Sequence, residues 1–409
     1  MAVIGVNKMS YRVISYNELH ARASNENLRA YPVEINHKDS GFYQVQVTPE
    51  GTLCLKSGDD GKRWELSPNA FKQLWKDAEL PISYDDSWPV ELLQHNLAWR
   101  YAQKAYRYQM IVDDKDRVIV FAPATFISIP TRRVLETVES ALKLCPNIFT
   151  PKLVRADNHS YVVYYVATDI VAHTRGGAVH GALELRTSPV GEFTTRICPA
   201  TFQTICSNGM VTGLRVIPGV AMRETSRNEA AILEAIAEVV PQCCDAALQE
   251  LQLLQQMETV PVQSLEDMLQ VLHARYPRRI SADDIRRILE YLDSISYTKK
   301  ISPIENAFDV IAAVTYAAQR CHFDLRTTSC LEELAGHFLH DIVDGHITSS
   351  TTSADVEQAA KKQTVQESIA AREKNTEARV TTSRSYPSQY TRPHTTRSTH
   401  RQNDDRLIQ

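Results

Sequence analysis

One short cluster in the sequence combines a nucleophilic thiol with a dipeptide that favours turns: Cys206, Ser207, Asn208 and Gly209. Asn and Gly both tolerate positive φ, so we expect a tight turn here, with the cysteine buried as a small apolar residue at the end of a strand. The alternative is a catalytic thiol, which needs a nearby base. The candidate bases lie on the strands expected before it: His159, His173 and His180. No catalytic signature accompanies the cysteine, so the pattern favours the structural interpretation.

A second candidate is the stretch HTRGGAVHG, residues 173–181. Backbone N–H groups of Gly176 and Gly177, together with the guanidinium of Arg175, could receive a phosphate, so we expect these three residues to contact nucleic acid. The stretch lacks the Gly-Lys-Ser/Thr ending of a P-loop. The competing interpretation is a flexible hairpin loop without a ligand.

The third candidate is a set of arginines in the β-rich region between residues 150 and 217: Arg155, Arg175, Arg186, Arg196 and Arg215. Tyr161, Tyr164 and Tyr165 are interleaved with them. A basic sheet face carrying aromatic rings binds single strands through phosphate attraction and base stacking. We therefore expect Arg186, Arg196, Arg215 and Tyr164 to contact nucleic acid, although solvated arginines and core tyrosines would give the same pattern.

The sequence predicts no metal site and no cofactor. Five potential ligands lie close together near the end of the helical region: Cys321, His322, Cys330, His337 and His340. Their spacing matches no usual zinc pattern. The eight cysteines include no CxxC pair, and we expect reduced thiols in a cytoplasmic protein.

The elements that must position these residues form an α+β pattern. We expect β hairpins over residues 1–66, with GFYQVQVTPEGTLCLKS as one hairpin. Residues 67–220 form the core: Ser67 and Pro68 begin a helix, 131–144 is another, and 150–217 is an antiparallel meander. Residues 221–345 are helical, with helical segments on both sides of Pro241 and a helix beginning at Ser281.

Residues 346–409 are expected to be a low-complexity and mostly disordered tail. From Thr376 onward the chain has six arginines against three acidic residues, a net charge of +3, whereas the whole 409-residue chain has −4. A neutral to acidic body thus carries a basic tail. No apolar run is long enough to span a membrane and no secretory signal is evident.

One block of the sequence, ALELRTSPVGEFTTRICPATFQTICSNGM, resembles a phage- and plasmid-associated domain family of unknown function. The stretches LSPNAFKQLWKDAELPISY and ELLQHNLAWR are also similar to the opening of that family, so the resemblance covers residues 65 to 240. The family has an arginine just before its Cys-Ser-Asn-Gly turn, and Gln203 and Thr204 stand there instead. The matching positions are Arg186, Ser188, Gly191, Cys206, Ser207, Asn208 and Gly209.

The resemblance implies a mobile-element context without an established activity. Proteins in that context often handle single-stranded DNA, and strands followed by helices are compatible with annealing proteins by analogy. We therefore expect a single-stranded DNA-binding protein that acts in replication or recombination. There are two alternatives. One is a self-assembling or partner-binding protein without catalysis, which would form a homo-oligomer. The other is a Cys206-dependent enzyme.

Overall fold

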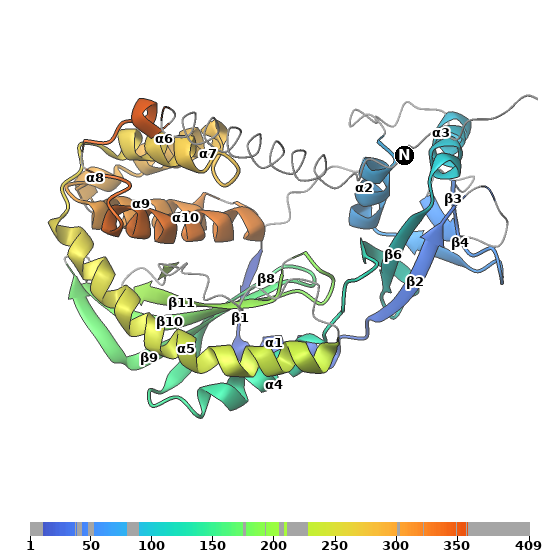
Figure 1. Ribbon diagram of the computed structural model, residues 1–409, viewed down its shortest axis with the longest axis horizontal. Coiled ribbons are helices and arrows are strands. Elements are labelled where there is room, and N and C mark those ends of the chain that lie inside the picture. The colour runs from blue at the N-terminus through green and yellow to red at the C-terminus, as the bar shows by residue number, and fades with distance from the viewer. Residues whose placement is uncertain are drawn as a thin grey trace, which may run out of the picture. The chain divides into compact units, whose positions relative to one another are not determined.

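The structure is a computed structural model that describes residues 11–36, 38, 43–47, 53–79, 90–174, 177–192, 194–203, 208–210, 228–300, 303–321, 323–348, 350–356 and 358. These residues form two six-stranded sheets, which we call sheet A and sheet B, followed by a series of helices (Figure 1). The predicted α+β architecture is confirmed.

Sheet A contains the predicted meander. Its strand order is β1-β8-β9-β10-β11-β12 and every neighbouring pair is antiparallel. Five strands that follow one another in the chain, β8 to β12, therefore lie side by side, and β1 adds to the free edge of β8. The strands are β1 (Arg12–Ile14), β8 (Phe149–Ala156), β9 (Tyr161–Thr174), β10 (Gly177–Thr187), β11 (Arg196–Gln203) and β12 (Asn208–Met210).

Helices cover both faces of sheet A (Figure 1). Alternate residues of a strand face opposite sides, so Tyr161, Val163 and Tyr165 pack in one core with α1 (Tyr16–Ser24), α4 (Thr131–Leu142) and α5 (Glu229–Gln256). Val162, Tyr164 and Val166 face the other side, where they pack in a cluster with Leu325 of α10 (Leu325–Val343). The meander is thus buried on both faces, which explains why its strands read as long apolar runs.

Sheet B has the strand order β2-β6-β7-β5-β4-β3, with β5 and β7 parallel and the other pairs antiparallel. It forms a core of its own with α2 (Pro68–Asp77) and α3 (Val90–Gln103). The predicted hairpin is confirmed as β3 paired with β4, although its turn lies outside the described residues. The strands are β2 (Arg29–Ile35), β3 (Gln44–Val47), β4 (Leu53–Lys56), β5 (Arg63–Leu66), β6 (Tyr106–Val112) and β7 (Arg117–Pro123).

The expected boundary between residues 66 and 67 runs through sheet B, because β5 before it pairs with β7 after it. The first expected segment is divided as well, since β1 belongs to sheet A and β2 to sheet B. The next boundary, at residues 220 and 221, lies outside the described residues, as does most of the tail.

Side-chain caps begin the helices where the sequence predicts them. The Ser67 hydroxyl accepts a hydrogen bond from the Ala70 N–H at 3.1 Å, with Pro68 as the first residue of α2. At α7 (Ala282–Ser294), Ser281 and Asp284 form a reciprocal capping box. The remaining helices of this region are α6 (Leu265–Arg275), α8 (Tyr297–Lys300) and α9 (Ala307–Arg320), with a 3-10 turn at Met257–Thr259.

Pro241 lies inside α5 and does not end it. A proline lacks the N–H that would bond the carbonyl four residues earlier, a loss that usually kinks or breaks a helix. Here Val240, just before it, and Cys243, two positions after it, are fully buried in the core against sheet A. Packing on the sheet offsets the missing hydrogen bond, and the two predicted helical segments form one helix.

Candidate functional site: a buried arginine network

Three of the predicted arginines lie in one row across sheet A. Arg155 on β8 and Arg186 on β10 both stand opposite Val162 of β9, and Arg186 stands opposite Arg196 of β11. Residues directly opposite one another in a sheet point to the same face. The register therefore brings these three guanidiniums to one side, with Tyr164 and Glu184 two positions further along their strands.

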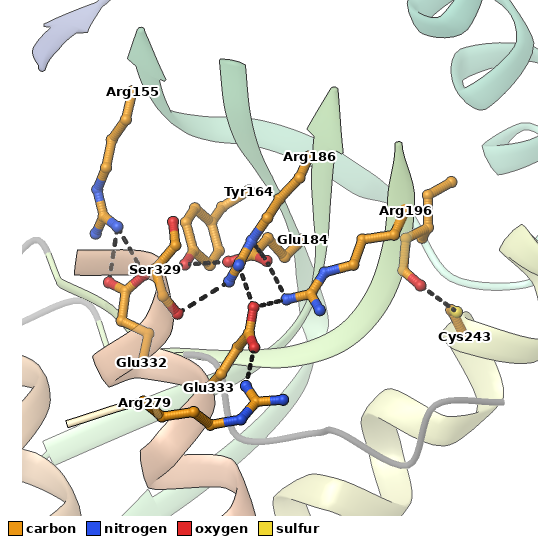
Figure 2. A network of polar contacts seen from close by, with 11 residues as sticks. Arg155, Tyr164, Glu184, Arg186, Arg196, Cys243, Arg279, Ser329, Glu332 and Glu333 are labelled. Carbon is orange, nitrogen blue, oxygen red and sulfur yellow. Dashed lines mark hydrogen bonds and ion pairs between the residues drawn. The ribbon is translucent and has the colours of Figure 1, made fainter. Parts of the chain in front are cut away.

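Helix α10 covers that row with two consecutive carboxylates, Glu332 and Glu333 (Figure 2). Nη1 of Arg155 lies 2.7 and 2.8 Å from the two carboxylate oxygens of Glu332. The side chains of this pair are 2% and 0% exposed. Gln319 of α9 donates to the same carboxylate at 2.9 Å, so the partner of Arg155 is itself held by a second helix on this face.

Tyr164 lies between the two carboxylates at the buried end. Its hydroxyl is 2.7 Å from Glu184 and 2.9 Å from Glu332. Burial, with help from these two carboxylates, raises the pKa of the phenol far above its ordinary value, so the hydroxyl stays protonated and acts as a donor. Burial also raises the pKa of Glu332, and the neighbouring Arg155 only partly opposes that shift.

Glu333 is the centre of the network, because it forms ion pairs with three guanidiniums: Arg186, Arg196 and Arg279 (Figure 2). Arg279 comes from the segment between α6 and α7. Burial raises the pKa of Glu333, but the three positive charges together outweigh it and hold the pKa below its ordinary value. The carboxylate therefore stays ionised although it is buried.

The network has more positive than negative charge at its outer end. Arg186, Arg196 and Arg279 share the two carboxylates Glu184 and Glu333 through five ion-pair contacts. The exposed fraction of the three arginine side chains rises from 5% to 17% to 35% in that order. One unit of excess positive charge is thus located where the network meets solvent.

Not every arginine N–H group of this network is used in a hydrogen bond among the described residues. Nε of Arg196 and Nη2 of Arg155 are buried and have no hydrogen-bond partner among the described residues. The Arg279 side chain donates to Glu333 through Nη1, and no other hydrogen bond of this guanidinium is seen among the described residues. A guanidinium has five N–H donors, so the partly exposed Arg279 and Arg196 can still bind an anion.

Another arginine lies close to this outer end. The Cys330 thiol of α10 is an electrostatic neighbour of Arg186, Arg279 and Arg326, which lower its pKa, although burial raises it by more. Arg326 is exposed in the first turn of α10, and Arg278 is exposed next to Arg279. Exposed guanidiniums therefore flank the partly buried ones.

The prediction that Arg186, Arg196 and Tyr164 line an open basic face is wrong in one respect. The arginines do share a face, but α10 covers it and supplies the carboxylates that pair with them. Tyr164 is fully buried, and Tyr161 and Tyr165 face the opposite core. Stacking of bases on these tyrosines is therefore excluded in this conformation.

The predicted turn at Asn208 and Gly209 is also wrong. These residues begin β12, where they pair with Gln203 and Phe202 of β11. Residues 204–207, which connect the two strands in the sequence, lie outside the described residues. Five of the candidate residues lie outside the described residues. Cys206 and Ser207 belong to this connection, and the others are Arg175, Gly176 and Arg215.

The remaining candidates lie at the end of the β9–β10 hairpin. Gly177 has a φ of +106°, which suits glycine, and begins β10 opposite Thr174. His173 pairs with Ala178, and His180 pairs with Val171. Nδ1 of His180 is buried without a hydrogen-bond partner among the described residues. Their distance to the Cys206 thiol is not defined, so the catalytic alternative stays a prediction.

Two other arrangements are less suited to a site. In the described residues no group of three Cys, His, Asp or Glu side chains is arranged to hold a metal ion. A cavity of about 400 Å³ lies between α1, the β6–β7 turn and the β8–β9 turn, lined by Glu18, Glu26, Asp113 and His159 among others. The Glu26 carboxylate accepts a hydrogen bond from the Thr131 N–H, and Asp113 forms an ion pair with Arg117. These carboxylates therefore serve local structure.

No family model matches the chain, and no curated protein or solved structure is significantly similar to it. Over the part of the chain that the structure describes, no helix combines the length and apolar character needed to cross a membrane.

Four residues of the network are not among those predicted from the sequence: Glu332, Glu333, Glu184 and Arg279. A signal for the first two exists: the pair of carboxylates lies inside the apolar run LEELAGHFL, where it is surrounded on the helix by core residues. Charged residues are almost never fully buried unless they are paired. An acidic pair in such a run therefore indicates basic partners, although it does not say which.

Proposed function

We propose that the protein is a non-catalytic nucleic-acid-binding protein that contacts the phosphates of a single strand at the outer end of the arginine network. The observation that carries the proposal is the sharing of Glu333 by three guanidiniums, of which Arg196 and Arg279 are partly exposed. The excess positive charge and the partly exposed guanidiniums there fit a phosphate, which guanidinium groups bind in a bidentate manner.

The buried part of the network has a positioning role in this proposal. Arg155, Arg186 and Tyr164 are inaccessible and cannot contact a ligand directly. They fix α10 on sheet A, and thereby hold Glu333 and its partly exposed arginines in place. The basic tail, with a net charge of +3 from Thr376 onward, adds attraction that is independent of sequence.

Four of the described cysteines are poor candidates for a catalytic nucleophile. Burial raises the pKa of Cys54 and Cys330, and that of Cys198 and Cys321 to about 11. Only the thiolate is a good nucleophile, so these cysteines are inert near neutral pH.

The test is fluorescence anisotropy of the full chain with labelled single-stranded DNA, double-stranded DNA and RNA at roughly 50 and 200 mM salt. We expect single-stranded DNA to bind best and its affinity to fall with salt. Arg279→Ala should weaken binding and reduce the slope of log K against log salt by about 1, the value for one lost phosphate contact. Arg286→Ala is the matched control, because Arg286 is an exposed arginine of α7 that pairs with Asp283.

If the two substitutions weaken nucleic-acid binding equally, the outer end of the network is not part of the binding site. Absence of salt-dependent binding to any of the three nucleic acids would contradict the proposal as a whole. A chain that ends at Asn375 tests the tail separately from the network. If only the tail binds nucleic acid, this shortened chain loses all affinity, whereas Arg279→Ala in the full chain leaves the affinity unchanged.

A further inference from the structure

Two cysteines that are distant in sequence lie almost in bonding contact. Cys145 follows the last turn of α4, where its N–H donates to the carbonyl of Leu142, and Cys244 lies in the middle of α5. Their Sγ atoms are 2.7 Å apart. A disulfide bond is about 2.05 Å long, so closing it needs a movement of less than about 1 Å.

The two thiols differ in their access to solvent. Cys145 is partly exposed, whereas Cys244 is 1% exposed. Burial, together with the hydrogen bond to Cys145, raises the pKa of Cys244 well above its ordinary value. A reagent from solution therefore meets Cys145 first, and Cys244 is the thiol that reacts second.

Other cysteines near this pair are less well placed. Cys243 is fully buried and its Sγ lies 3.8 Å from the carbonyl oxygen of Ile197, on the side of α5 that faces β11. Cys198 is also buried in that region. Burial raises the pKa of both thiols, which leaves Cys145 as the accessible member of the four.

We propose that Cys145 and Cys244 form a redox pair that closes to a disulfide when it reacts with a low-molecular-weight disulfide such as oxidised glutathione. The Cys145 thiolate attacks one sulfur of the oxidant, its proton having passed to water, and one molecule of reduced glutathione leaves. Cys244 then attacks the Cys145 sulfur of the mixed disulfide, and the second glutathione leaves as a thiolate that takes up a proton. The protein loses two protons and two electrons, and oxidised glutathione takes them up to become two molecules of the reduced form.

The bond would connect the loop after α4 to the middle of α5. The two residues are 99 positions apart, and the chain between them includes β8 to β12, the strands of the arginine network. Because α4 and α5 already pack on the same face of sheet A, the cross-link requires no rearrangement of the fold (Figure 1).

The experiment is a thiol map of the full chain. The reduced protein is incubated with a series of glutathione redox buffers and quenched with acid, its free thiols are alkylated, and its peptides are identified by mass spectrometry. We expect a linked peptide that joins Cys145 to Cys244, lost on treatment with a reductant. Cys145→Ser should abolish it, and Cys321→Ser, which removes a partly buried cysteine elsewhere, should leave it unchanged.

Three results would overturn the proposal: alkylation of both thiols at every redox ratio, a lasting glutathione adduct on Cys145 without closure, or linkage of either residue to another cysteine. The wild-type map decides between them even if Cys145→Ser fails to fold. Nucleic-acid binding is not used in this assay, so its outcome is independent of the proposed function.

Discussion

Arg155 on β8 and Glu332 on α10, 177 residues apart in the chain, form an ion pair that is almost entirely removed from solvent. The guanidinium also lies 5.4 Å from the ring centroid of Tyr164 and 5.6 Å from that of Tyr11. Sheet A and the helical region are therefore joined through charges that are costly to bury unless every partner is present.

The first prediction concerns this pair. Glu332→Gln leaves Arg155 buried without a counter-charge, and we expect the free energy of unfolding to fall by about 3–5 kcal/mol. Asp283→Asn is the control, because it removes an exposed partner of Arg286 and should change stability by less than about 0.5 kcal/mol. Urea denaturation measures both. Equal midpoints for the two variants would show that the pair contributes nothing.

A second prediction distinguishes two glycines with similar backbone angles. Gly191 has a φ of +76° and Gly345 a φ of +72°. A Cβ at Gly191 would lie 2.9 Å from Cε2 of Phe126, whereas a Cβ at Gly345 meets nothing within 4 Å. Both alanine substitutions incur the left-handed backbone penalty of about 1–2 kcal/mol. Gly191→Ala should destabilise the protein by more than that, and identical thermal shifts would contradict the close packing.

The third prediction concerns pH. Burial, with help from Arg279, lowers the pKa of His337 to about 4. The unfolded value is about 6.5, so the unfolded state takes up this proton first and stability falls as the pH decreases from 6.5 toward 4. Between pH 7 and pH 5 this residue accounts for a loss of about 2 kcal/mol.

His337→Gln should flatten the stability profile between pH 7 and pH 5 by that amount, as followed by urea denaturation at each pH. His95→Asn, at an exposed position of α3, should keep the wild-type profile. A wild-type profile for the His337 variant would show that its imidazole is protonated equally well in both states.

The fourth prediction follows from the proposed disulfide. A cross-link that closes a loop of 99 residues lowers the entropy of the unfolded chain and should raise stability by up to about 4–5 kcal/mol. Thermal unfolding of the oxidised and reduced protein measures the difference. The same comparison on Cys145→Ser should give no difference, and a change there would assign the effect to other thiols.

Local patterns in the sequence predict much of the fold. Ser67 followed by Pro68, and Ser281 followed by Asp284, indicate helix starts because capping involves residues that are neighbours in the chain. The strands β8 to β11 are predictable for the same reason, since hairpin neighbours pair in sequence order. Pro241 predicts two separate helical segments, but α5 is one helix, because its packing on sheet A outweighs the local propensity of the proline.

The site is predictable only in part. The arginines of the meander converge on one face, which strand alternation makes foreseeable. Their burial is not, because it depends on Glu332 and Glu333, more than 130 residues away from Arg186. The contact between Cys145 and Cys244 is equally hidden, since cysteine spacing alone does not determine which thiols meet.

The two consecutive carboxylates of α10 have a geometric consequence. Neighbouring residues on a helix project about 100° apart, so Glu332 reaches toward Arg155 while Glu333 reaches toward Arg196 and Arg279. A roll of the helix about its axis, or a slide along the sheet, would break both sets of ion pairs at once. A helix that presented only leucines to the sheet could pack on it at several angles, whereas the ion pairs of Glu332 and Glu333 form at a single angle.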